Sequence, residues 1–528
     1  MYPRSFADSD GDGVGDLDGL TGRLDHIAGL GADALWLSPV YSSPMRDFGY
    51  DVADHTSVDP LFGDLAGFRR LLADAHALGL RVLVDFVPNH TSDLHPWFTA
   101  SRSSRADPQR KWYHWRDPAP GGGPPNNWLG TFGGPAWTLD ERTGQYYLHS
   151  FLPQMPDLDW RNPEVRAAMA DVVRFWLDLG VDGLRVDCAA AIGKDPGLRD
   201  NPPAPPGALA MHRPLAEYDS QAHVHDAGHP DAHDWYRALR ALVDGYPGDR
   251  VVLGEVHERD PARWAAYYGR DLDGIHLPFA FGLLACRPTA EGVRAVVVDA
   301  LAAVPAGAVP CWVLGNHDER RVVSRFGADR ARLLVVLLLT LPGAAVLYYG
   351  DELGLPDAET APGQVRDPWA LVHPDLGRDP ARAPVPWTDE PGRGFTTGEP
   401  WLPFPVAASV AAQDADPGST LALTRALGRF RAGSRVVREG SLEFVDTGSA
   451  GTGSAGTALG DVLAYRRVLP GEPEVLVLLN FGDGAVGFDL PANRRWAPVM
   501  YTVRSRPIAN RVEIGPLEGL VVREQGLG

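Results

Sequence analysis

A regular alternation of short apolar strands and amphipathic helices constrains this chain most. Helix-like segments such as Leu65–Leu78 and Pro163–Leu179 separate the strand-like runs. Alternation of this kind indicates βα units and a parallel sheet. Counting a truncated first strand, we predict eight strands and an α/β fold, a (β/α)8 TIM barrel. The other predicted strands are Ala34–Ser38, Arg81–Phe86, Gly183–Asp187, Val251–Gly254, Gly274–Leu277, Cys311–Leu314 and Ala344–Tyr349.

Charged residues stand where several of these strands end. Arg185 and Asp187 lie two residues apart, so both point to one face of their strand. Two further strands end at Glu255 and near Asp318. Because the carboxyl ends of barrel strands meet at one mouth, we expect the three acids to converge there. The side chains expected around them are Asp51, His90, Arg185 and His317.

Converging carboxylates suit the hydrolysis of a sugar acetal, in which one acid is the nucleophile and another the proton donor. The neighbouring cation Arg185 would keep Asp187 ionised. Two neighbouring acids would raise the proton affinity of Glu255, as a general acid requires. For Arg185 and Asp187 alone, a structural ion pair is the alternative. No Ser–His pair, nucleotide loop or His-rich metal cage competes in the sequence, and we expect no organic cofactor.

The barrel alternation is interrupted once and ends before the chain does. A segment rich in Trp, Gly, Pro and Asn follows the third strand, and residues from about 433 alternate in β fashion. We predict a catalytic barrel from residues 1–90 and 158–432, an inserted subdomain B at 91–157 and an antiparallel C-terminal β-sandwich at 433–528. The near-repeat of residues 447–457 is predicted to be a flexible hairpin tip.

Composition limits the partners. The 49 basic and 68 acidic residues leave a net charge of −19, which argues against nucleic acid and anionic membranes. The longest apolar run, Leu333–Leu341, is too short to span a bilayer and predicts a buried helix.

Three scattered cysteines suggest free thiols in a reducing, cytoplasmic setting. The chain opens with almost no first strand, so we expect the natural start to lie upstream. The oligomeric state is left open.

Near the start of the chain, acidic residues alternate with glycines. Such carboxylates can surround a hard cation with oxygens, and a backbone carbonyl at the seventh position can join them. Gly19 occupies the position where an EF-hand needs glutamate, so the loop is not an EF-hand. An acidic turn without metal is the alternative. The candidate ligands are Asp8, Asp10, Asp12, the Val14 carbonyl and Asp16.

Eight motifs together resemble glycoside hydrolase family 13, the α-amylase family, in its oligo-1,6-glucosidase/α-glucosidase branch. They are DSDGDGVGDLDGL, FGYDVADH, DFVPNH, MPDLDW, GLRVD, GEV, GNHD and YYGDELG. The resemblance implies Asp187 as nucleophile, Glu255 as acid/base and Asp318 as the group that stabilises the transition state. It implies a glucose subsite lined by Asp51, His90, Arg185 and His317, and it places Arg382 near the aglycone. It further implies that the acidic loop binds Ca²⁺, although Mg²⁺ is possible.

The resemblance implies a retaining, exo-acting α-glucosidase that releases glucose from short maltose- or isomaltose-type oligosaccharides. One alternative is a transglucosylase or isomerase acting on sucrose or maltose. A distant alternative is a non-catalytic ectodomain like those of transporter heavy chains. Cys188 follows the nucleophile where the branch usually has Val, Ala or Thr, so the choice between α-1,4 and α-1,6 bonds stays open.

Overall fold

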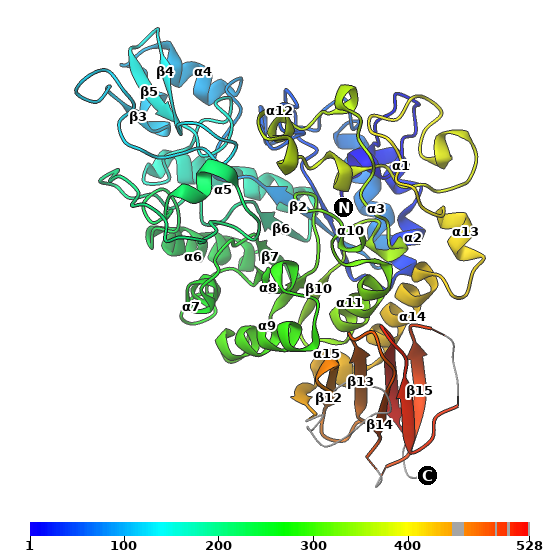
Figure 1. The fold of residues 1–528 in the computed structure, drawn as a ribbon. Helices are drawn as coiled ribbons and strands as arrows, with labels where there is room; N and C mark the ends of the chain where they lie inside the picture. Colours follow the sequence, from blue (N-terminus) through cyan, green and yellow to red (C-terminus); the bar gives the residue numbers. More distant parts are fainter. Residues whose placement is uncertain (446–458, 492–493, 504–506, 526–528) are drawn as a thin grey trace.

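A curved parallel sheet forms the centre of the protein in the computed structural model (Figure 1). The structure describes residues 1–445, 459–491, 494–503 and 507–525; the near-repeat at 447–457 lies outside them. All seven strands of the sheet pair in parallel, in the order in which they occur in the chain. They are β1 (Ala34–Leu37), β2 (Arg81–Phe86), β6 (Gly183–Val186), β7 (Val251–Gly254), β8 (Leu277–Ala280), β9 (Cys311–Val313) and β10 (Ala344–Val346).

β1 and β10 are the two edges of this sheet in the described part of the chain. The backbone of Met1 lies against the β1 edge. Its amino group donates to the Trp36 carbonyl at 2.6 Å, and its carbonyl accepts from the Ser38 amide at 2.9 Å. The first residue therefore makes strand-like contacts at the place where the predicted first strand would lie.

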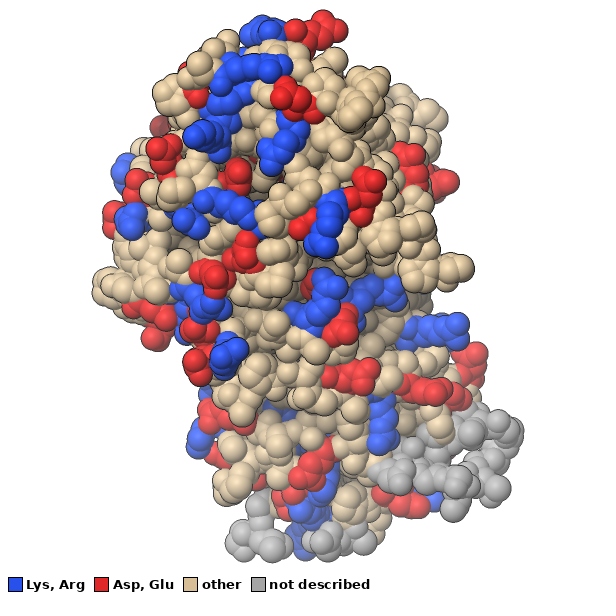
Figure 2. Space-filling model, turned by 90° about the vertical axis from the view of Figure 1, so that its left-hand side faces the viewer, with Lys and Arg blue, Asp and Glu red and all other residues tan. Residues whose placement is uncertain are grey.

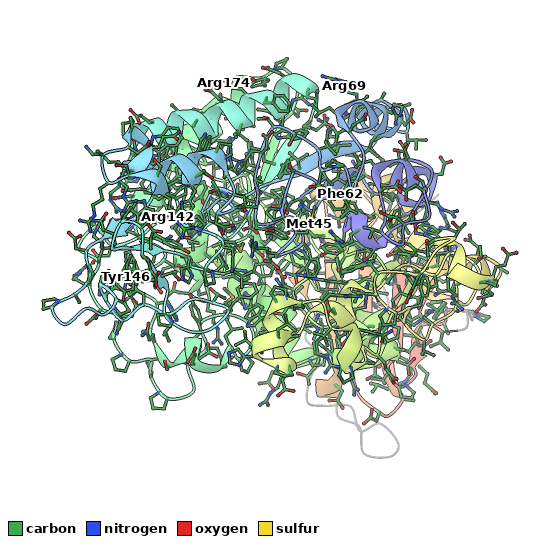
Figure 3. The ribbon with its side chains drawn as sticks, turned by 90° about the horizontal axis from the view of Figure 1, so that it is seen from above. Met45, Phe62, Arg69, Arg142, Tyr146 and Arg174 are labelled. Carbon is green, nitrogen blue, oxygen red and sulfur yellow. The ribbon has the colours of Figure 1, made fainter. Side chains whose placement is uncertain are left out.

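Amphipathic helices surround the sheet. Figure 3 shows Arg69 on α3 and Arg174 on α5 at the outer rim, with Met45 and Phe62 nearer the centre. α5 begins at the Asn162 cap, whose side chain accepts from the Glu164 amide, and it ends at Gly180 with a φ of 112°. The main helices are α3 (Leu65–Ala77), α5 (Pro163–Leu179), α6 (Asp231–Asp244), α9 (Ala290–Ala303), α11 (Ala328–Thr340) and α14 (Thr420–Gly433).

The apolar run predicted to be a buried helix is α11. Its residues from Leu333 to Leu338 are all at most 5% exposed. The helix packs against α14 and also against the C-terminal domain, where Arg467 Nη1 donates to the Thr340 carbonyl at 2.6 Å. A helix covered on all sides needs no polar face, which explains its composition.

The interval between β2 and β6 carries a small sheet of its own. Its order is β3-β5-β4, with antiparallel pairing throughout. Trp128, Trp137 and Leu148 pack together there as a separate cluster. The elements are α4 (Pro96–Ser103), β3 (Trp115–Arg116), β4 (Trp137–Asp140) and β5 (Gln145–Leu148).

The C-terminal region is a β-sandwich. Alternate residues of β13, such as Val477 and Leu479, join the main core, while Leu476 and Leu478 face the second sheet. The first sheet is β11 (Ser441–Phe444), β12 (Val462–Val468), β13 (Val475–Asn480), β17 (Gly519–Glu524) and β15 (Trp496–Tyr501); the second is β14 (Val486–Asp489) with β16 (Arg511–Ile514).

Among the seven strands of the parallel sheet, one begins elsewhere than predicted, and β10 ends at Val346, three residues earlier than predicted. β8 begins three residues later than predicted, because a turn holds Gly274 away from the sheet. The amides of Gly274 and Ile275 donate to the carbonyls of Tyr268 and Tyr267. The strand therefore cannot start before Leu277.

On the face in Figure 2, acidic and basic side chains are interspersed. None of the helices in the described ranges is long and apolar enough to cross a membrane.

A buried ion pair fastens the inserted segment to the barrel. Lys194 Nζ lies 2.9 Å from Asp157 Oδ2, at the end of the insert, and 2.9 Å from Asn89 Oδ1, which follows β2. Lys194 and Asp157 are 1% and 0% exposed. Burial disfavours the carboxylate of Asp157, but Lys194, together with hydrogen bonds from Ser150, outweighs it and lowers the pKa of Asp157. The pair therefore fixes the insert over the sheet mouth.

Replacing Lys194 with Met should leave the Asp157 carboxylate buried without a cation. We expect the free energy of unfolding to fall by about 3–5 kcal/mol, measured by urea denaturation at pH 7. Arg70→Met is the matched control, because it removes an exposed ion pair with Asp18 and should cost far less stability. Equal losses in the two variants would contradict a special role for the buried pair.

Candidate active site

Arg185, at the end of β6, pairs with three buried carboxylates. Its Nη1 lies 2.8 Å from Asp85 Oδ1 and 2.6 Å from Asp187 Oδ1, and its Nη2 lies 2.8 Å from Glu255 Oε1. Asp85 belongs to β2 and Glu255 follows β7, the two neighbours of β6. All four residues are at most 5% exposed. One cation therefore brings together acids from three strands.

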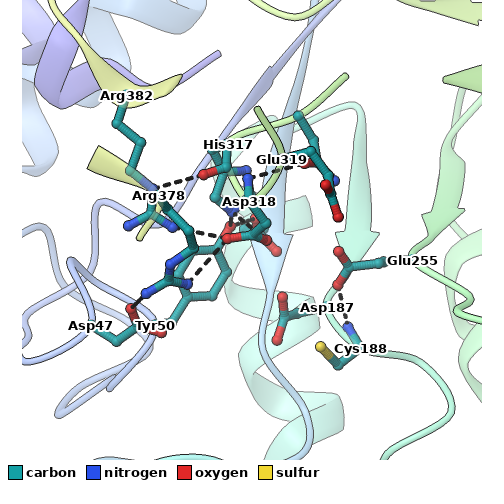
Figure 4. Close-up of polar contacts among 12 residues, drawn as sticks. Asp47, Tyr50, Asp187, Cys188, Glu255, His317, Asp318, Glu319, Arg378 and Arg382 are labelled. Carbon is teal, nitrogen blue, oxygen red and sulfur yellow. Dashed lines mark hydrogen bonds and ion pairs between the residues drawn. The ribbon is translucent and has the colours of Figure 1, made fainter. Parts of the chain in front are cut away.

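Asp187 and Glu255 lie close enough to act on one bond. A carboxylate oxygen of each and the thiol sulfur of Cys188 all lie within 4.8 Å of one another, as Figure 4 illustrates. Retaining glycosidases keep their two carboxyl groups about 5–5.5 Å apart, and inverting ones leave roughly 6.5–9.5 Å for a water. The spacing therefore matches the retaining arrangement.

Asp318 joins the same cavity from the loop after β9. Its Oδ1 accepts from Arg382 Nη2 at 2.9 Å and from Arg378 Nη1 at 3.1 Å. His317 Nε2 lies 3.4 Å from its Oδ2. These three neighbours lower the pKa of Asp318 well below its usual value even though burial opposes them. Asp318 is thus held as a carboxylate.

His90 and His317 stay neutral above mildly acidic pH. Burial lowers the pKa of His90 to about 4 and that of His317 to about 3. The His317 ring stacks on Tyr50 at 5.3 Å. His90 lines the cavity, and its Nε2 has no hydrogen-bond partner among the described residues. A neutral imidazole facing a cavity can bind a sugar hydroxyl.

Of the predicted binding residues, His90 lines the cavity, whereas Arg185 and His317 lie behind it against Asp187 and Asp318. Two others, Asp51 and Arg382, also lie outside the lining. Asp51 does not line the cavity: it is 0% exposed and accepts from the side chain of Ser43 and the amides of Arg46 and Asp47. Asp47, four residues earlier, lines the cavity instead. The sequence motif did not reveal which acid faces inward, because both lie in one irregular loop.

Arg382 was expected near the aglycone, but it is fully buried behind Asp318. Its Nε donates to the His317 carbonyl at 2.7 Å. The neighbouring Arg378 lines the cavity and binds both Asp318 and Asp47, the latter at 2.5 Å. Arg382 thus supports a catalytic-site acid, and Arg378 is the arginine that faces the cavity.

The protons of the central acids are distributed differently from the prediction. Burial disfavours the Glu255 carboxylate, but Arg185 and then His257 outweigh it and lower the pKa of Glu255. Burial, with the charges of Glu255 and Asp85, raises the pKa of Asp187 despite Arg185. Both shifts run opposite to the prediction of a raised pKa for Glu255 and an ionised Asp187. It overlooked that Arg185 contacts all these acids and that the Cys188 amide also donates to Glu255 at 2.9 Å.

A second chamber of about 320 Å³ adjoins the cavity and shares six of its lining residues. Its wall includes the segment from Ala204 to Ala227 and the start of the loop after β7. Volumes near this size accommodate small organic ligands. The shared residues are Thr131, Phe151, Cys188, Met211, Glu255 and His257.

Comparison with known families settles which group this site belongs to. The family described as "Alpha amylase, catalytic domain" matches residues 1–440. The chain belongs to the α-amylase family. The predicted membership in glycoside hydrolase family 13 is thereby confirmed, and so is the barrel with a β-rich C-terminal domain.

Members of the α-amylase family with assigned activities resemble the chain over most of its length. A probable alpha-glucosidase of Rhizobium meliloti is 43% identical, over 94% of this chain and 90% of the relative. An alpha-glucosidase of Culex pipiens is 36% identical, over 99% and 89%. Among solved structures, the alpha-glucosyl transfer enzyme XgtA has a TM-score of 0.91 at 41% identity. The trehalulose synthase MutB from Pseudomonas mesoacidophila MX-45 has 0.88 at 32%. Each of these two covers 99% of this chain and 98% of its own.

The acidic loop brings three of its predicted ligands together. Oxygens of Asp8, Asp10 and Asp16 lie within 4.8 Å of one another. Burial, and then the charges of these three acids, raise the pKa of Asp12. The loop packs on residues 395–401, since the Asp8 amide donates to the Phe395 carbonyl and the Trp401 amide to the Gly13 carbonyl. Hard oxygen donors crowded in this way fit a Ca²⁺ ion.

Four residues of the site were missed by sequence reasoning. Asp85 ends its strand, so the strand-end rule that found Asp187 could have found it. Asp47, Arg378 and His257 lie in loops, where no periodicity indicates which side chain faces inward.

Separate substitutions of Asp47 and Asp51 should have different effects, one on substrate binding and the other on protein stability. Asp47→Asn should lower kcat/KM about 10–100-fold, because a cavity carboxylate and its pairing with Arg378 are lost. Asp51→Asn should mainly lower the melting temperature, since the new amide group opposes backbone N–H donors. Steady-state kinetics and thermal denaturation of both variants measure this. A large loss of kcat/KM in Asp51→Asn, with only a lower melting temperature in Asp47→Asn, would show that Asp51 is the binding residue.

Proposed function

We propose that this protein is a retaining, exo-acting α-glucosidase that releases glucose from short maltose- or isomaltose-type oligosaccharides. One observation carries the proposal: Asp187, Glu255 and Asp318 line one cavity, with oxygens of the first two within 4.8 Å. α-Glucosidases that are 43% and 36% identical support the glucoside as substrate. A complete set of acids counts against the non-catalytic alternative.

In the first step, Asp187 attacks the anomeric carbon while Glu255 gives its proton to the glycosidic oxygen. The bond to the aglycone breaks, and a covalent glucosyl ester forms. Positive charge develops on the sugar ring in the transition state. Asp318, held as a carboxylate by Arg378 and Arg382, stabilises that charge.

The first step requires the proton of the coupled Asp187–Glu255 pair to reside on Glu255. Asp187 and Glu255 both contact Arg185, so their titrations are coupled. In the substrate complex, the pair must hold its one proton on Glu255 and leave Asp187 as the carboxylate that attacks. Glu255 then acts as the acid.

In the second step, Glu255 acts as the base. It takes a proton from a water that attacks the glucosyl ester, and glucose leaves with retained configuration. The interactions that lower the pKa of Glu255 favour this role.

Product analysis on maltose, isomaltose, sucrose, trehalose and an aryl α-glucoside tests the proposal. Release of α-glucose without a new disaccharide supports hydrolysis. Absence of turnover on every α-glucoside would remove the proposed function.

Transfer to a second sugar is the other candidate activity. The likeness to an alpha-glucosyl transfer enzyme and to a trehalulose synthase favours it. The adjoining chamber reaches Glu255, so an acceptor held there can replace water in the second step. A new disaccharide from sucrose or maltose would establish this activity.

Two substitutions test the roles of the central acids. Asp187→Asn should reduce kcat by about 10⁴-fold, equivalent to about 5 kcal/mol of transition-state stabilisation, on all substrates. Glu255→Gln should spare the aryl α-glucoside relative to maltose, because a good leaving group needs little protonation. Steady-state kinetics on both substrates measure these losses. Equal losses for Glu255→Gln would contradict its role as acid, and a fully active Asp187→Asn would end the assignment.

We propose in addition that Asp8, Asp10, Asp12, the Val14 carbonyl and Asp16 bind Ca²⁺, with Mg²⁺ as the alternative. The clustering of three of the carboxylates supports this. The ion would stabilise the loop and, through it, residues 395–401. We expect no organic cofactor, and we place the enzyme in the cytoplasm because its described cysteines are free.

Removal of the metal should lower the melting temperature. At a Ca²⁺ concentration 100 times its Kd, binding adds about 2.7 kcal/mol, which chelation removes. Melting curves with EDTA, Ca²⁺ or Mg²⁺ measure the effect, and Asp10→Asn should abolish it. Identical curves in all conditions would rule out the site.

A further inference from the structure

His257 contacts the proposed acid/base directly. It lies two residues after Glu255, and its Nε2 is 3.3 Å from Glu255 Oε1. Arg185 Nη2 contacts the same oxygen at 2.8 Å, while the Cys188 amide donates to the other. Both oxygens of Glu255 are therefore occupied, and His257 is the side chain among these contacts that lines the cavity and pairs with Glu255.

Packing fixes the His257 ring. Phe281 stacks against it with ring centres 4.8 Å apart and planes 10° from parallel. His212 packs on the same two rings, at 5.7 Å from His257 and 5.0 Å from Phe281. His257 Nδ1 is buried without a hydrogen-bond partner in the described part of the chain. The ring can therefore use only Nε2, on its Glu255 side, for a polar contact.

The charged and titratable groups around His257 come from four segments. Its own loop contributes Glu255, Glu258 and Arg259, and β6 with its end contributes Arg185, Asp187 and Cys188. The loop after β9 contributes Asp318 and Glu319, and the segment before α6 contributes His212 and Arg213. Among the non-arginine groups, His257 is the one for which the structure records an ion-pair contact with Glu255.

We propose that His257 is a positioning residue that controls when Glu255 holds its proton, by donating from Nε2 to Oε1. This inference rests on the proposed α-glucosidase function. A donor on a carboxylate favours the ionised form. His257 thereby prepares Glu255 for its second role, as the base that activates water, and it must yield Oε1 when the acid is protonated. The residue type at this position thus sets the balance between the two steps.

The pH dependence of kcat/KM on an aryl α-glucoside tests the proposal. Its alkaline limb reports the loss of the proton that the Asp187–Glu255 pair must carry. His257→Leu removes the donor, so the limb should move to higher pH by about one unit. His257→Gln keeps a donor and should restore most of the wild-type position.

Two controls separate this role from packing. His212→Leu removes a ring from the same cluster without touching Glu255, so the limb should not move. In a Glu255→Gln background, His257→Leu should produce no further shift. An unmoved limb in His257→Leu, or an equal shift in His212→Leu, would overturn the proposal.

A second measurement needs no turnover. Isotope-edited infrared titration of the Glu255 carboxyl in the free protein, assigned with Glu255→Gln, should show a higher midpoint in His257→Leu. An unchanged midpoint overturns the role of His257. If the wild-type protein cleaves no α-glucoside, the proposed function is ruled out. The midpoint of the infrared titration still shows whether His257 acts on Glu255.

Discussion

The active site depends on one buried guanidinium shared by three acids. Without Arg185, the carboxylates at the ends of β2, β6 and β7 would repel one another in a region that excludes water. One positive charge among three acids leaves the group short of positive charge even when Asp187 holds a proton. An oxocarbenium-like transition state supplies the missing positive charge. The site is therefore arranged for a sugar that becomes positively charged.

The same arrangement explains why the resting protonation differs from the reactive one. Glu255 accepts more contacts than Asp187, so it is the easier of the two to ionise. The first chemical step needs the reverse, with the proton on Glu255 and Asp187 as the attacking carboxylate. Backbone geometry contributes as well, because Cys188 has a φ of 39°, unusual for a residue other than glycine, and its amide points at Glu255.

Loops distant in sequence complete the pocket over this sheet. Phe132 from the insert, Leu215 from the segment before α6 and Trp369 from the long loop after β10 form one small apolar cluster. Arg378 lies over the rings of Phe132 and Trp369 while its guanidinium binds Asp47 and Asp318. The Lys194–Asp157 pair anchors the insert below them. The pocket wall is thus tied together by a few charged contacts.

The sequence by itself determined the barrel, the insert, the C-terminal β-domain and the acids at the strand ends. Strand and helix periodicities are local properties, and a residue at the end of a parallel strand has its position fixed by that strand. Only the tertiary structure decided that Asp47 and Arg378 line the cavity in place of Asp51 and Arg382, because irregular loops carry no periodicity. It also decided the directions in which the pKa values of Asp187 and Glu255 shift. A pKa depends on every charge within several ångströms, and Arg185, His257 and Asp85 come from separate segments of the chain.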